Sequence, residues 1–190
     1  TAILLWPVFR DKLAQNERSL FAFLASTEHG SFSHFLRIAE WSGSTPPLYR
    51  ISNLYDYVGH VLGPGIALGA DSRRWAEIRD ALDRLPADAP PVAADVLKSI
   101  GLLSLYGPAV GLRASFPLLQ AAVGVDEATL ADVLRYLQSK SLVLWRQYNR
   151  TYRIWEGSDL DLEAAFRDAL PRVGQELSTL LRKSVDLQPI

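Results

Sequence analysis

The feature that most constrains the fold of this chain is a short break between two apolar helical patterns, at residues 123–126. Gly124 suits the left-handed backbone that ends a helix, and Asp126 is a favourable N-cap for the next one. The flanking helices are predicted at residues 116–123 and 127–140. A turn this short makes the two helices neighbours that share a core. Apolar residues at i, i+3, i+4 and i+7 predict the buried face of the second helix: Leu130, Val133, Leu134 and Leu137.

The segments around this turn extend the pattern. Residues 92–106 form a strongly apolar helix that a Gly-Pro pair ends. After the turn motif, residues 142–148 and 151–155 are predicted strands, joined by a two-residue hairpin turn at 149–150. The order helix, short helix, turn, helix and β-hairpin predicts a winged helix-turn-helix with a two-stranded wing.

The rest of the chain is also helical by pattern, so the fold class is mainly α. Residues 1–90 are predicted to form an N-terminal helical bundle. Residues 86–91 contain three prolines, which end the preceding helix and place the main domain boundary there. Residues 91–158 then form the winged-helix domain, and residues 159–190 form C-terminal helices that pack on the rest.

Local signals predict several helix ends in the N-terminal domain. Pro7 suits a first helical turn, where its missing N–H costs nothing. Ser52 is predicted to be the N-cap of one helix, and Asp71 or Ser72 the N-cap of the helix at residues 73–85.

No catalytic or metal-binding motif is found. The chain has no Cys, which excludes thiol catalysis and a Cys-based zinc site. No phosphate-binding P-loop is present, and the Gly-rich run at residues 63–69 is predicted to be a turn. His29, His34 and His60 form no metalloprotease motif. Asp56 lies four residues before His60, so the two pair either as a base with its orienting residue or as ordinary helix-surface neighbours. We expect no enzyme, no metal and no cofactor in this segment.

Charge and hydropathy limit the partners. The formal net charge of −1 gives no general attraction to nucleic acid or to acidic lipid. Apolar runs fall far short of the roughly 20 residues of a membrane span, and the N-terminus does not resemble a signal peptide. We therefore expect a cytoplasmic protein without a membrane partner. The chain contains no Met and begins at Thr1, so we expect it to be a segment of a longer protein.

Winged helices commonly bind DNA by placing the second helix of the turn motif in the major groove. Here that helix has three acidic residues against two basic ones, Arg135 and Lys140. The wing is basic through Arg146, Arg150 and Arg153. These arginines either contact phosphate, form a solvated face or pair with carboxylates of another domain.

The predicted register of the hairpin pairs Tyr148 with Thr151. Arg146 and Arg153 would then lie directly opposite each other, which is unfavourable for like charges unless water or an anion separates them. The other face of the hairpin is expected to pack on the helices through Trp145, Tyr152 and Ile154.

Four segments together resemble a known architecture: QNERSLFAFL at 15–24, LYDY at 54–57, LKSIGLL at 97–103 and YRIWEGSD at 152–159. They resemble the region downstream of the nucleotide-binding core in large bacterial P-loop ATPases of the AAA+ and STAND type. In such proteins a helical lid and a winged helix follow the core and relay the nucleotide state to effector domains or oligomer contacts. The resemblance implies that Arg18 is a lid arginine near the nucleotide, whereas its polar neighbours are more typical of a solvated helix face.

The nucleotide-binding core itself is absent from this sequence, so ATP hydrolysis is not assigned to it. The sequence predicts a non-catalytic regulatory or protein-interaction module of a larger ATP-binding protein. Its partners would be other domains of that protein or a separate protein. The alternative is a DNA-binding winged-helix transcriptional regulator that uses the wing arginines. The sequence leaves the oligomeric state open.

Overall fold

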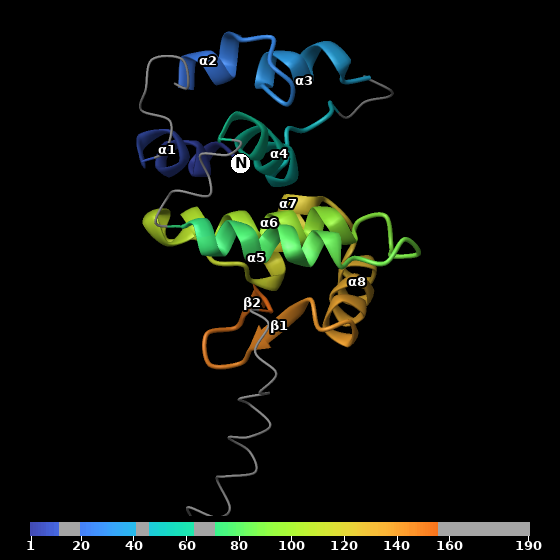
Figure 1. The fold of residues 1–190 in the computed structure, drawn as a ribbon. Helices are drawn as coiled ribbons and strands as arrows, with labels where there is room; N and C mark the ends of the chain where they lie inside the picture. The colour runs from blue at the N-terminus through green and yellow to red at the C-terminus, as the bar shows by residue number, and fades with distance from the viewer. Residues whose placement is uncertain (12–19, 41–45, 63–70, 156–190) are drawn as a thin grey trace, which may run out of the picture. The chain divides into compact units, whose positions relative to one another are not determined.

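The computed structural model describes residues 1–11, 20–40, 46–62 and 71–155 (Figure 1). Within these ranges the protein is mainly α-helical, with one two-stranded antiparallel sheet. Every element described belongs to one compact unit, which ends at Trp155. The mainly α class, with a helical bundle and a hairpin wing, is therefore confirmed.

Helices make up the first part of the chain, and the winged helix makes up the second. The first part contains α1 (Ala2–Asp11), α2 (Leu20–Ala25), α3 (Phe32–Ile38), α4 (Ile51–Leu62) and α5 (Ser72–Asp83). The second part contains α6 (Ala93–Tyr106), the 3-10 helix η2 (Gly107–Val110), α7 (Phe116–Val123), α8 (Glu127–Ser139), β1 (Val143–Arg146) and β2 (Thr151–Ile154). Within the described ranges, none of the helices combines the length and apolar character that crossing a bilayer would require.

The turn between α7 and α8 has the predicted geometry. Gly124 follows α7 in the left-handed conformation, with φ of 75°, and its N–H donates to the carbonyl of Gln120 at 2.7 Å. The Asp126 carboxylate accepts a hydrogen bond from the Thr129 N–H at 2.9 Å and so caps α8. The predicted core face of α8 is buried as a set: Leu130, Val133, Leu134 and Leu137.

Helix α6 lies at the centre of the compact unit. It contacts α4, α5, α7, α8 and β2, and Figure 1 shows α5 running beside it. Its side chains at Leu97, Ile100 and Leu102 have no exposed surface. Full burial of such a side chain contributes roughly 1.5–3 kcal/mol, so the helices around α6 depend on it for much of their stability.

The Pro-rich segment at residues 86–91 connects helices that share this core. Helices α1, α4 and α5, which precede it, all contact α6, which follows it. Lys98 Nζ of α6 also lies 2.8 Å from the carboxylate of Asp56 in α4. The described parts of the predicted domains 1–90 and 91–158 thus lie in one compact unit, which ends at Trp155. The predicted C-terminal helices at residues 159–190 lie outside the described residues.

Two helix starts differ from prediction, and a third has the predicted N-cap residue without a capping bond. Pro7 lies in the interior of α1 rather than in its first turn, and it is buried. Helix α4 begins before Ser52, because the side chain of Asn53 accepts a hydrogen bond from the Arg50 N–H at 2.8 Å and satisfies that end of the helix. Asp71 occupies the N-cap position of α5 but makes no side-chain capping bond.

The wing has a longer turn than predicted. Arg146 pairs with Thr151, so residues 147–150 form a four-residue connection instead of a two-residue turn. A two-residue turn of the common hairpin type needs positive φ at both central residues, which Asn-Gly favours and Asn-Arg does not. In the structure Arg150 has a φ of 51°, and Asn149 is not among the residues with positive φ.

This register changes the relationship between the two wing arginines. Arg153 lies opposite Leu144, so Arg146 and Arg153 are diagonal neighbours on one face rather than direct partners. The opposite face carries the predicted set Trp145, Tyr152 and Ile154. Ile154 is buried and Tyr152 packs against the core, so this face fixes the wing to the helices.

Candidate functional site

Helix α8 occupies the position of the DNA-reading helix in a winged-helix fold, and its surface is poorly suited to phosphate. Arg135 pairs with the Asp132 carboxylate at 2.7 Å, and the Lys140 Nζ lies 5.6 Å from the centroid of the Tyr136 ring. The two basic side chains that the sequence singled out on this helix thus contact residues of α8 itself. The first turn adds acidic side chains, which repel a nucleic-acid backbone.

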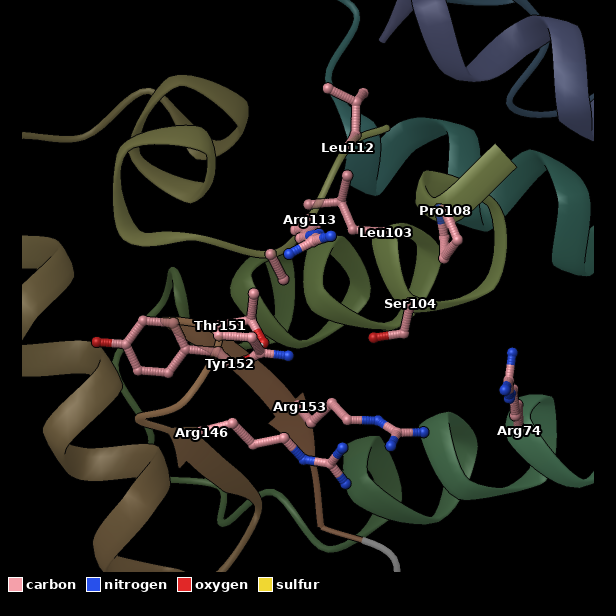
Figure 2. A pocket seen from close by; sticks show the side chains of 12 residues that line it. Arg74, Leu103, Ser104, Pro108, Leu112, Arg113, Arg146, Thr151, Tyr152 and Arg153 are labelled. Carbon is pink, nitrogen blue, oxygen red and sulfur yellow. The ribbon is translucent and has the colours of Figure 1, made fainter. Parts of the chain in front are cut away.

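Arginines from three separate parts of the fold line a pocket of about 270 Å³ beside the wing (Figure 2). Arg146 and Arg153 extend from the wing, Arg74 comes from α5, and Arg113 comes from the segment between η2 and α7. Among the described residues that line the pocket, every charged side chain is an arginine. Arginine keeps its charge at any physiological pH, so the pocket is strongly positive.

The fold brings these arginines together through backbone contacts. The Tyr152 N–H donates to the Ala114 carbonyl at 2.8 Å, which holds β2 beside the segment that carries Arg113. Gly111 has a φ of 70° and ends η2 just before that segment. Arg74 lies in the first turn of α5, which packs on α6 and β2.

Some of the polar side chains that line the pocket already form hydrogen bonds within the protein. Arg146 donates to the Tyr148 hydroxyl at 2.9 Å, and the Ser104 hydroxyl donates to the Ile100 carbonyl at 2.8 Å. The Thr151 hydroxyl donates to Oδ1 of Asn149 at 2.6 Å, so the amide nitrogen of that asparagine remains a donor on the pocket wall.

Outside the pocket, several cations have carboxylate partners in the described part of the chain. These pairs are Arg73–Glu77, Arg84–Asp80, Lys98–Asp56 and Arg135–Asp132. Within the same ranges, no carboxylate pairs with Arg74, Arg113 or Arg146. Like charges that share a pocket repel each other, so an anion bound among them would relieve the repulsion.

The sequence pattern singled out two of the four arginines that line this pocket. Of its candidate residues, Arg146 and Arg153 line the pocket, whereas Arg150 is exposed on the turn and does not. Arg18 and the Gly-rich run at residues 63–69 lie outside the described residues. Arg74 and Arg113 match no local sequence motif, because each lies at an ordinary polar position of its own segment.

The histidines also gather, at a smaller cavity of about 110 Å³ that His29, His34 and Asp56 help to line. The ring centroid of His29 lies 5.1 Å from that of His34 and 5.9 Å from that of His60. In the described structure the Asp56 carboxylate forms an ion pair with Lys98. In the described part of the chain, no group of three or more His, Cys, Asp or Glu side chains is suited to a metal ion.

Large apolar side chains are exposed on the N-terminal helices. Phe21 of α2 is 80% exposed and Trp6 of α1 is 67% exposed. Further exposed aliphatic residues lie on α1, α2 and α3 and just before α4: Ile3, Leu20, Leu24, Leu36, Ile38 and Leu48. By comparison, Tyr148 is the exposed aromatic residue of the wing turn.

No family model matches this chain, and no match was found among curated proteins or solved structures.

Proposed function

We propose that this chain is a non-catalytic winged-helix module that acts through protein contacts. Its partners are other domains of a larger ATP-binding protein or a separate protein. The observation that supports the proposal most directly is the exposure of Phe21 and Trp6 among other apolar residues of α1–α3. Apolar side chains lose water favourably only when another surface covers them, so such a concentration is typical of an interaction site.

The charge of α8 supports the same proposal. A helix that enters the major groove places its first turns against bases and phosphates. Here the first turn contains Glu127 and is capped by Asp126. The Asp126 carboxylate is charged at neutral pH, as an ordinary aspartate is, and hydrogen bonds from Thr129 lower its pKa further. A protein surface accommodates these carboxylates more readily than a polyphosphate backbone does.

One observation favours the DNA-binding alternative. Arg146 and Arg153 gather with two further arginines, and such a basic surface could hold a phosphate backbone without α8 in the groove. On this alternative, Arg146→Gln and Arg153→Gln weaken duplex binding, the affinity falls steeply with added salt, and Arg135→Gln has little effect.

Site-specific photo-crosslinking in cells tests the protein-contact proposal. A benzoyl-phenylalanine is placed at Phe21 in one variant and at Tyr148 in another, because both side chains are largely exposed, by 80% and 77%. We expect a discrete cross-linked product from position 21, mapped by peptide mass spectrometry to another domain or another protein. Position 148 is expected to give none.

A position-21 variant that gives no product, or the same products as position 148, would contradict the proposal. A duplex titration at low salt provides the second comparison. Absence of binding removes the DNA-binding alternative, and binding with the arginine dependence given above replaces the protein-contact function with it.

A further inference from the structure

We infer that the four-arginine pocket is a binding site for a small ligand that carries a diphosphate or triphosphate group. The site comprises Arg74, Arg113, Arg146 and Arg153, and it uses none of the apolar residues of α1–α3. Its position between the wing and the helices would let such a ligand hold β2 against α5 and α6, which contact it in the protein.

Charge is the first argument. Four guanidinium groups line one pocket, and no carboxylate lines it among the described residues. Three of these groups, on Arg74, Arg113 and Arg146, have no carboxylate partner within the described ranges. A single orthophosphate carries at most about two negative charges at neutral pH, whereas a diphosphate carries about three. The condensed phosphate therefore matches the pocket better.

Geometry is the second argument. The planar guanidinium fork binds phosphate oxygens in pairs, which favours phosphate over a spherical anion. Figure 2 shows Arg146 and Arg153 extended side by side from the wing, with Arg74 on the opposite side of the pocket. Cations on opposite walls suit an elongated anion, because a compact one would reach only one wall. The amide nitrogen of Asn149 adds an uncharged donor.

Size is the third argument. A volume of about 270 Å³ lies just below the range for drug-sized ligand sites, which is roughly 300–1,000 Å³, and so suits a small ligand. Such a concave site takes a phosphate chain, whereas a DNA duplex presents a convex backbone spread over a wide surface. The ligand class is therefore a condensed phosphate, either free or attached to an organic group such as a nucleoside.

Isothermal titration calorimetry on the full chain tests this inference with defined probes. We expect inorganic pyrophosphate and tripolyphosphate to bind at least about tenfold more tightly than orthophosphate or sulfate. Binding should weaken as salt is added. Titration with ADP distinguishes a free condensed phosphate from one attached to a nucleoside. If ADP binds more tightly than pyrophosphate, the ligand is a nucleoside diphosphate. If the two bind equally, the phosphate chain alone is recognised. Both results support a condensed-phosphate site.

Substitutions locate the site. Arg74→Gln and Arg113→Gln should each weaken pyrophosphate binding by about ten- to a hundredfold, since each removes a charge-assisted hydrogen-bonding group. Both arginines are exposed, so the variants are expected to fold, which circular dichroism checks. Arg73→Gln is the matched control, because Arg73 precedes Arg74 on α5 but pairs with Glu77 at 2.9 Å. Arg146→Lys should also weaken binding, because it keeps the charge but loses the fork.

Three results would overturn the inference. The first is that no condensed phosphate binds at low salt. The second is that Arg73→Gln weakens binding as much as Arg74→Gln, which would show only a general charge effect. The third is that duplex DNA displaces pyrophosphate and that DNA binding depends on the same arginines. This result would show that the pocket binds a nucleic-acid backbone.

Discussion

Gly101 of α6 lies so close to Ile78 of α5 that a Cβ at position 101 would fall 2.7 Å from Cγ1 of Ile78. Arg74 is one turn before Ile78 on the same helix face, and Ser104 is one turn after Gly101. Both Arg74 and Ser104 line the arginine pocket. The close approach of the two helices therefore sets the spacing of one wall of the site.

Gly101→Ala is expected to destabilise the protein by about 1–3 kcal/mol, because the added methyl group overpacks the α5–α6 contact. Gly59→Ala in α4 is the matched control, since a Cβ at that position meets no atom within 4 Å. The control should be neutral or up to about 1 kcal/mol more stable, as alanine favours the helix. Urea unfolding measures both changes. Equal effects of the two substitutions would show that α5 moves away from α6 freely.

Gly124→Ala is expected to cost more than Gly111→Ala. Both residues have positive φ, 75° and 70°, so a Cβ at either position costs about 1–2 kcal/mol in backbone strain. At Gly124 the Cβ would also displace the guanidinium of Arg50, which donates to the Ala122 carbonyl at 3.4 Å, whereas at Gly111 it meets open space. The difference between the two losses of stability, measured by urea unfolding, reports the contact with Arg50. A larger loss from Gly111→Ala would refute it.

Two tyrosines should respond oppositely to removal of the hydroxyl group. The Tyr49 hydroxyl donates to the Gly30 carbonyl at 2.6 Å, so Tyr49→Phe should lower the free energy of unfolding by about 1 kcal/mol. The Tyr57 side chain has no exposed surface, and its hydroxyl has no hydrogen-bond partner in the described structure. Tyr57→Phe should be neutral or stabilising by up to about 1 kcal/mol. Thermal unfolding distinguishes the pair, and a clear loss from Tyr57→Phe would reveal a missing partner.

Alkaline pH should destabilise the protein through Tyr55 and Tyr57. Burial raises the pKa of each to about 12, above the value of about 10 in an unfolded chain. Between these values the unfolded chain releases protons that the folded chain keeps, so stability falls as pH rises. We expect Tyr55→Phe to make this fall shallower in urea titrations at several pH values. An unchanged slope would show that Tyr55 ionises equally in both states.

The cap of α8 should be sensitive to acid. The Thr129 hydroxyl, followed by its N–H, donates to Asp126 and lowers the pKa of that carboxyl. The resulting stabilisation is present above the carboxyl pKa of the unfolded chain and is lost as pH falls through the folded value. Thr129→Val removes only the hydroxyl bond, so it should raise the Asp126 pKa in an NMR titration. An unchanged pKa would mean that the backbone bond alone sets it.

Local signals predicted the winged helix closely, because they act within a few residues. Helix α7 has its predicted limits, since Gly124 alone suits the left-handed turn that ends it. Asp126 begins α8 for a similarly local reason, through its bond to the Thr129 N–H. The 3.6-residue period of α8 also placed its buried face correctly, because its four apolar residues recur on one side of the helix. Cap prediction was wrong at Ser52, where a neighbouring side chain, that of Asn53, satisfied the helix end instead.

The amino-acid sequence by itself therefore determined the helices, the turn and the wing, because helix capping, periodicity and turn chemistry are properties of short segments. Tertiary structure alone decided which distant segments meet. It joined the helices on both sides of residues 86–91 in one unit. It also brought Arg74 and Arg113 to the wing. Such contacts depend on how helix surfaces and strand edges fit in three dimensions, and no local pattern encodes that fit.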